Sequence, residues 1–311
     1  MTNDIQLIDE PKVTRKKKSS FWRVFWKVFG NIAYYLVGVI LAILFLFPLV
    51  YMIAASTKTE AMHAAHAGTL LMFVPNFDIT QMFNNYSVLF TEFAVYKYFI
   101  NSLIYAAIVI VLNILVNGLA GYAIAKFTFP GKKLFNFLII FLIVVPVETS
   151  IIPLYEVVKD LLQLKQELSV LAVILPPTIS IFNIFLFVQF FKGIPTEYEE
   201  AARMDGANSL QIFFKIIIPL SKPIVATVAV FAFIGVWNDY LWPIMVLPYA
   251  SADEWPLYPI QAALTSIQSI EGITTGEVMA SLVFTSVPIF IVYVAAQKYI
   301  VQGFGSAGLK L

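Results

Sequence analysis

The chain has 311 residues, of which 60% are hydrophobic and only 13% are charged, and its formal net charge is +1. Soluble domains carry about 25% charged residues, so this composition excludes a soluble protein and indicates an integral membrane protein. The chain contains no cysteine, which excludes disulfides and thiolate chemistry.

The N-terminal part combines a charged tail with an apolar helix. Residues 1–30 form a polar tail and an aromatic, basic segment typical of a membrane interface. The basic run 15–18 lies next to an apolar stretch, which favours an orientation signal over a nucleic-acid site. The apolar stretch 32–54 exceeds the core of about 7–15 residues expected in a signal peptide, so we predict a retained transmembrane helix. With the outer loop that follows, it makes up residues 31–98.

Five further apolar stretches follow, and each is long enough to cross about 30 Å of hydrocarbon as a helix. They are residues 99–125, 134–157, 168–191, 219–247 and 278–301. The sequence therefore predicts an all-α membrane protein with six transmembrane helices. Prolines and glycines inside these stretches predict kinks, which membranes tolerate where neighbouring helices satisfy the freed backbone groups.

Lysine and arginine define the orientation, because they concentrate in cytoplasmic loops. With the N-terminus inside, the outer segments contain only Lys58, Lys97, Lys159 and Lys165, which leaves 16 of the 20 basic residues on the cytoplasmic side. Both termini and the polar loop 194–223 are therefore predicted to be cytoplasmic.

The loop 194–223 is predicted to be helical rather than slack. Thr196 and Glu199 have the spacing of a capping box, and acidic residues occupy the first turn, where the helix dipole favours them. Gly206 is expected to end this helix. A second short helix is expected over about Ser209–Lys215, and Glu200 and Arg203 have the spacing of a helical ion pair.

This loop also carries a family resemblance. It contains, in order, Glu200-Ala201-Ala202, Asp205-Gly206-Ala207 and Ile216-Ile217-Ile218-Pro219-Leu220. The pattern resembles the EAA loop of ABC importer permeases, with Ile218 where the family usually has leucine. The flanking residues make it similar to the carbohydrate branch, in particular the smaller permease of maltose-type importers.

The resemblance implies a type I ABC importer permease fold, with residues 99–311 as the permease core and 194–223 as the coupling loop. It implies that Glu200, Ala201, Ala202, Asp205 and Gly206 couple the chain to a separate ATPase. ATP and magnesium would bind to that ATPase, and this chain would hold no cofactor.

The implied function is transport of a sugar or oligosaccharide in a binding-protein-dependent importer of a bacterial cell membrane. The implied partners are a second homologous permease, an ABC ATPase dimer, an extracytoplasmic solute-binding protein, the sugar and membrane lipid, but no nucleic acid. The chain would be a transport subunit rather than an enzyme, with no catalytic residue.

Several polar residues in apolar surroundings are candidates for the substrate path, because ionisable groups at membrane depth are costly and usually functional or paired. Glu148 precedes Ile152-Pro153-Leu154-Tyr155, which resembles the IPLY segment of the family, where glutamine is common at the position of Glu148. Trp237-Asn238-Asp239 resembles the family's Trp-Asn-acid signature, and Asn183 is one of several amides suited to hydroxyl groups. A helix end at the water interface, or a hydrogen bond between helices, would explain the same residues.

Other functions are also compatible with the sequence. The sequence contains no phosphate loop, zinc-protease motif or nucleophile elbow, and His63 and His66 have no third metal ligand nearby. The rivals are an ABC permease for a non-sugar solute such as a polyamine, phosphate or peptide, an ion-coupled secondary transporter that uses Glu148 or Asp239 as proton carrier, and a membrane scaffold that does not transport.

Overall fold

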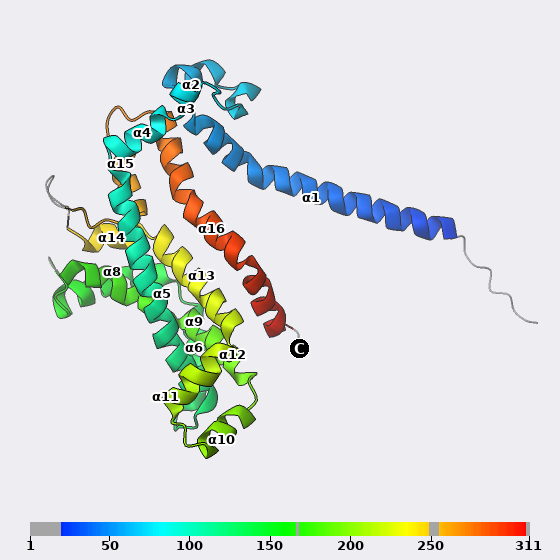
Figure 1. Cartoon of the computed structure of the whole chain (residues 1–311), viewed down its shortest axis with the longest axis vertical. Coiled ribbons are helices and arrows are strands. Elements are labelled where there is room, and N and C mark those ends of the chain that lie inside the picture. The colour runs from blue at the N-terminus through cyan, green and yellow to red at the C-terminus, as the bar shows by residue number, and fades with distance from the viewer. Residues whose placement is uncertain (1–19, 166–167, 249–254, 309–311) are drawn as a thin grey trace, which may run out of the picture. The chain divides into compact units, whose positions relative to one another are not determined.

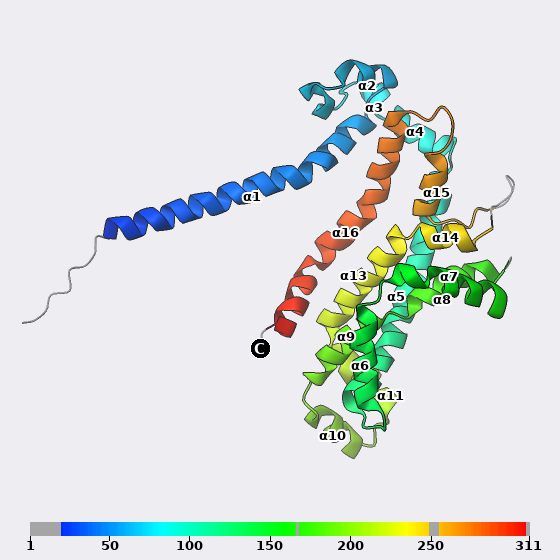
Figure 2. The same cartoon turned by 180° about the vertical axis from the view of Figure 1, so that it is seen from behind.

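The computed structural model describes residues 20–165, 168–248 and 255–308, and within these ranges every regular element is helical (Figures 1 and 2). The predictions for the tail 1–19 and for residues 309–311 lie outside the described residues. The chain divides into two compact units, residues 1–51 and 52–311. Most of α1 (Ser20–Ser56) belongs to the first, and its apolar side chains are exposed over most of its length.

The second unit contains the remaining helices. In its first half these are α2 (Glu60–His66), α3 (Ile79–Met82), α4 (Asn84–Thr91), α5 (Val95–Lys126), α6 (Lys132–Ile143), α7 (Ile151–Glu156), α8 (Ser169–Thr178) and α9 (Ile181–Lys192). In its second half they are α10 (Glu197–Met204), α11 (Ser209–Ile212), α12 (Ile218–Leu220), α13 (Lys222–Asn238), α14 (Leu241–Val246), α15 (Ile260–Ile267) and α16 (Thr275–Gly308). Short 3₁₀ turns occur at Leu70–Phe73 and Val147–Ser150, and π turns at Val157–Leu161 and Phe213–Ile217.

The helices of the described residues are consistent with the six predicted membrane-spanning segments, two of which are bent helix pairs. Four segments are long and apolar enough by themselves: Phe25–Ser56, Val95–Lys126, Ser169–Lys192 and Thr275–Lys298. Two helix pairs bring the number up to six, with bends of 101° between Lys132–Ile143 and Val147–Leu161 and of 87° between Ser209–Leu220 and Lys222–Asn238. The span predicted over 134–157, with kinks at its prolines, is thus a bent pair. Pro146 explains the break, because proline has no N–H and disfavours helical backbone in the residue before it.

α5 is the central column of the second unit and packs against α8, α9 and α13, while α16 packs against α13 (Figures 1 and 2). Gly121 allows the approach of α9, since a Cβ atom at this position would lie 2.5 Å from the Cβ of Phe187. Small residues serve this purpose in membrane helices, where packing replaces the hydrophobic driving force. α2 to α4 lie near one end of α5, and α10 and α11 near the other (Figure 1).

An aromatic cluster holds α10 and α11 at this end. Phe187 and Phe191 of α9 stack with ring centroids 5.3 Å apart, and Tyr122 of α5 lies 5.5 Å from Phe213. Ala202 of α10 belongs to the same buried cluster. The polar loop 194–223 predicted from the sequence is therefore packed against the ends of α5 and α9.

Candidate functional site

α10 begins as predicted but is not capped as predicted. Thr196 is the N-cap residue, yet its side chain makes no capping hydrogen bond. The capping box with Glu199 was wrong because Glu199 turns inward to α5. The first turn does contain three acidic residues, Glu197, Glu199 and Glu200. Their negative charges interact favourably with the positive end of the helix dipole.

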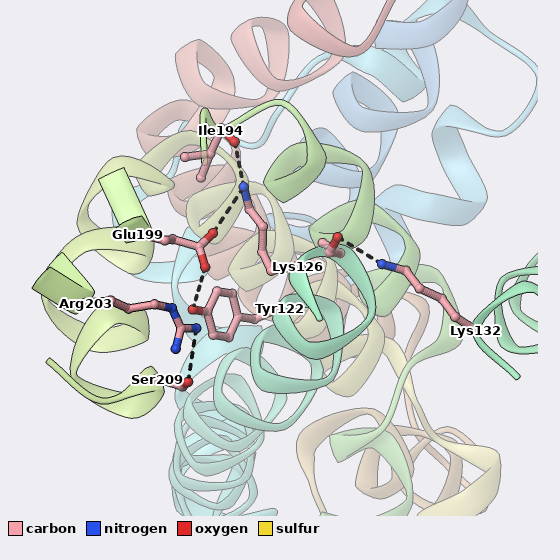
Figure 3. Close-up of polar contacts among 8 residues, drawn as sticks. Tyr122, Lys126, Lys132, Ile194, Glu199, Arg203 and Ser209 are labelled. Atoms are coloured by element: carbon pink, nitrogen blue, oxygen red, sulfur yellow. Dashed lines mark hydrogen bonds and ion pairs between the residues drawn. The ribbon is translucent and has the colours of Figure 1, made fainter. Parts of the chain in front are cut away.

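Glu199 is buried between α10 and the end of α5 (Figure 3). The hydroxyl of Tyr122 donates a hydrogen bond to its Oε2 atom at 3.0 Å, and the Nζ atom of Lys126 lies 3.2 Å from Oε1. Lys126 Nζ also donates to the carbonyl oxygen of Ile194 at 2.6 Å, just before the helix. The two charged side chains are only 6% and 9% exposed. Sequence analysis missed Tyr122 and Lys126, and the three-residue spacing of Glu199 and Ala202 is the sign of an inward helix face.

The coupling residues that the family resemblance implies lie on α10 and in the turn that follows it, and they differ in exposure. Glu200, Ala201 and Asp205 are exposed, whereas Ala202 is 8% exposed and packs inward. Arg203 is also exposed, and its guanidinium donates to the Oγ atom of Ser209 at 3.4 Å rather than pairing with Glu200 (Figure 3). The exposed surface of α10 therefore carries both acidic and basic side chains, while Ala202 packs into the buried aromatic cluster.

The turn after α10 depends on Gly206. Its φ of +82° lies in the left-handed region, which glycine adopts without the penalty that a Cβ atom imposes. The predicted helix end is confirmed. α11 follows with a capping box that sequence analysis missed: Asn208 Oδ1 accepts from Gln211 N–H, and Gln211 Oε1 accepts from Asn208 N–H, both at 2.9 Å. The expected helix 209–215 is shorter, because the backbone widens into the π turn at Phe213–Ile217 ahead of Pro219.

The candidates for the substrate path lie on different elements. Glu148 is exposed in the 3₁₀ turn at the bend between α6 and α7. Trp237 is fully buried, and its Nε1 donates to the carbonyl oxygen of Thr285 at 3.1 Å, which ties α13 to α16. Asn238 is exposed and bonds to its own helix, while Asp239 Oδ1 accepts from the backbone N–H of Trp242 at 3.2 Å.

Asn183 lies inside the second unit, beside the break between α8 and α9. Its Nδ2 donates to Asn113 Oδ1 at 2.8 Å, while Asn113 Nδ2 donates to the carbonyl oxygen of Pro177 at 3.0 Å. Asn117 Nδ2 donates to the carbonyl oxygen of Thr178 at 2.9 Å, and its Oδ1 accepts from the N–H of Ser180. These amides satisfy the carbonyl groups of Pro177 and Thr178, which lie at the C-terminal end of α8, and the N–H of Ser180, the N-cap of α9. Backbone groups at a helix end have no partner within the helix, so at membrane depth they need one from elsewhere in the protein.

The comparisons with known proteins agree with this geometry. Residues 117–306 match the protein family described as binding-protein-dependent transport system inner membrane component. The chain is 32% identical to the arabinooligosaccharides transport system permease protein AraQ of Halalkalibacterium halodurans, over 87% of this chain and 93% of that protein. It is 38% identical to the sn-glycerol-3-phosphate transport system permease protein UgpE of Yersinia pestis, over 66% and 70% of the two chains.

One solved structure is also similar over nearly the whole chain. It is the crystal structure of a bacterial ABC transporter involved in the import of the acidic polysaccharide alginate, with a TM-score of 0.73 and 28% sequence identity. The match covers 88% of this chain and 96% of the matched one.

Proposed function

Because this chain belongs to the family of binding-protein-dependent transport system inner membrane components, we propose that it is the permease subunit of an ABC importer for a sugar or oligosaccharide. The observation that carries the proposal is α10, a short polar helix at the end of the bundle with one face exposed and the other fixed to α5. A permease needs such an element to receive movement from an energy source outside the membrane.

The proposed partner at this surface is an ABC ATPase. The exposed side of α10, with Glu200, Ala201 and the C-cap residue Asp205, would lie in a groove of the ATPase subunit, as amphipathic helices do in grooves generally. ATP and magnesium would bind to the ATPase dimer and not to this chain. Gly206 would permit the turn that presents α10, and Ala202 would hold it to the bundle.

The orientation of the chain supports this arrangement. The distribution of lysine and arginine favours a cytoplasmic position for both termini and for residues 194–223. The exposed face of α10 would then be where ATP is available. An extracytoplasmic solute-binding protein would deliver the substrate to the opposite side, and a second homologous permease would complete the pathway.

The names of the similar systems support a carbohydrate substrate. Two of the three concern an oligosaccharide or a polysaccharide, and the third concerns sn-glycerol-3-phosphate. The last name favours a second candidate function, which is import of a phosphorylated polyol. In either case, the exposed residues Glu148 and Asn238 could face the second permease. The buried residues Asn183 and Trp237 would support the helices that line the path. Asp239 would hold the start of α14 at the end of α13, through its hydrogen bond with Trp242.

The test is uptake by the complete importer, reconstituted in proteoliposomes with its ATPase, second permease and binding protein. We expect uptake of labelled arabino-oligosaccharide, alginate oligosaccharide or glycerol-3-phosphate that requires ATP and survives dissipation of the proton gradient. The variant Glu200→Lys should reduce both uptake and binding of the ATPase, while the amount of the protein in the membrane stays unchanged. Uptake by this chain alone, driven by a pH step, would instead establish a secondary transporter.

A further inference from the structure

α10 has few buried contacts, and one of them is charged. Of its eight residues, only Glu199 and Ala202 are buried. Ala202 contributes a single methyl group to the packing. The buried polar attachment of α10 to α5 therefore passes through the Glu199 carboxylate, which contacts Tyr122 and Lys126.

The chemistry of this attachment favours a positioning role over a stabilising one. A buried ion pair loses hydration on both sides, and apolar residues of similar volume often stabilise a fold as well or better. What a buried pair with several hydrogen bonds does provide is a defined register between two elements. Lys126 adds to this register because it also holds the Ile194 carbonyl oxygen, and so fixes the chain on both sides of the start of α10.

We propose that Tyr122, Lys126 and Glu199 are positioning residues that make α10 and α5 move as one body when the ATPase acts on α10. This inference rests on the proposed function, because it takes α10 as the point where the ATPase acts. The role proposed for the three residues is positioning, not contact with substrate or ATP. Without them, α10 would rotate relative to α5, and its displacement would not reach the membrane helices.

The far end of α5 shows where the movement would arrive. Asn101 Nδ2 donates to the carbonyl oxygen of Pro256 at 2.6 Å, and the hydroxyl of Tyr105 donates to that of Leu257 at 2.8 Å. Trp255 Nε1 donates to Asn101 Oδ1 at 2.9 Å. Asn101, Tyr105 and Lys126 all lie on α5, which is one continuous helix of 32 residues. Displacement of its inner end is thus transmitted to the loop that precedes α15 at the outer end.

The first experiment measures the number of ATP molecules hydrolysed per substrate molecule imported by the complete importer in proteoliposomes. We expect Lys126→Met and Glu199→Gln to raise this ratio severalfold, because ATP hydrolysis would then move α10 without moving α5, while the amount of ATPase bound stays unchanged. The reciprocal exchange, Lys126→Glu with Glu199→Lys, should restore much of the coupling. Lys192→Met is the matched control, because Lys192 is an exposed lysine at the inner end of α9.

The second experiment observes the position of α10 directly. The natural chain has no cysteine, so spin labels on Glu197→Cys of α10 and Lys133→Cys of α6 report one distance without background. We expect a narrow distance distribution in the otherwise natural chain and a broad one with Glu199→Gln. A loss of stability alone would lower the signal without broadening the distribution of the inserted protein.

The outcomes separate the two proposals. If Glu200→Lys leaves ATPase binding and uptake intact, the proposed function of α10 fails. If Glu200→Lys behaves as expected while the Lys126 and Glu199 variants keep both a low ATP ratio and a narrow distribution, only the positioning role is overturned. Should these variants not insert, Tyr122→Phe decides, since it removes one hydrogen bond and no charge. Failure of Tyr122→Phe to insert would assign the cluster to folding and also overturn the proposal.

Discussion

The side chain of Asn183 donates a hydrogen bond to the Oδ1 atom of Asn113 at 2.8 Å, although 70 positions separate the two residues in the sequence. Asn113 Nδ2 in turn donates a hydrogen bond to the carbonyl oxygen of Pro177, at the break between α8 and α9. The C-terminal end of α8 is therefore attached to α5 by amides, because the last carbonyl groups of a helix have no partner within it.

Asn113→Ala should lower the free energy of unfolding by about 1–2 kcal/mol, since it removes one hydrogen bond to Pro177 and leaves the amide of Asn183 without its acceptor. Thermal unfolding in detergent, followed by tryptophan fluorescence, measures the change. The control is Asn136→Ala, because Asn136 Nδ2 bonds within α6 to the carbonyl oxygen of Lys132. Equal effects of the two substitutions would contradict the fastening role.

Gly206→Ala tests the turn after α10. The substitution should cost about 1 kcal/mol of local stability, because the φ of +82° is unfavourable for a residue with a Cβ atom, while no atom lies within 4 Å of that Cβ. The matched control is Gly235→Ala in α13, which also has nothing within 4 Å but is helical, so it should be neutral or stabilising. Hydrogen exchange of residues 197–206 compares them, and similar exchange in both variants would be the contrary result.

Ala201 and Ala202 are neighbours with opposite expected responses to the same substitution. Ala202→Asp places a carboxylate in the buried aromatic cluster and should destabilise the chain by about 3 kcal/mol, with reduced membrane abundance. Ala201→Asp leaves the fold unchanged, because Ala201 is exposed, and should weaken binding of the ATPase. Quantitative membrane blots and co-purification of the ATPase separate the two effects. Normal abundance of Ala202→Asp would show that α10 is not packed as described.

Reporter fusions check the orientation. Fusions after Lys132 and Asn208 should report the cytoplasm, and fusions after His66 and Lys165 the outside, because the basic residues concentrate on one side. An external reporter at Asn208 would remove α10 from the compartment that contains ATP.

Local chemistry made much of this structure predictable. The apolar stretches predicted the membrane helices, and Gly206 predicted the end of α10, because both depend on properties of neighbouring residues. The bend of 101° after Ile143 was not predictable, although the sequence showed Pro146, because a proline indicates a break and not its angle.

The partner of Glu199 illustrates the other limit. Thr196 lies within the same turn of helix, so the sequence favoured a capping box. The Glu199 carboxylate instead accepts a hydrogen bond from the hydroxyl of Tyr122, 77 positions earlier. Tertiary contacts of this kind override local capping, and their only trace in the sequence is the inward face shared by Glu199 and Ala202.

Lys58 allows a prediction of pH dependence. It follows α1, the residue is only 2% exposed, and its Nζ donates to the carbonyl oxygens of Leu71 at 2.7 Å and Met72 at 3.0 Å. Burial disfavours the ammonium form and lowers the pKa of Lys58 from its ordinary value of 10.5. In the unfolded chain, Lys58 keeps the ordinary pKa.

Between these two pKa values the unfolded state binds more protons than the folded state, so Lys58 makes stability rise with pH across this window. Below the lowered pKa the charge is buried and its cost is fully present, and above 10.5 it has disappeared. Thermal unfolding midpoints in the alkaline range should rise more steeply in the natural chain than in Lys58→Met. The control Lys133→Met, which removes an exposed lysine, should follow the natural chain. Parallel curves for all three proteins would show that Lys58 is not desolvated by the fold.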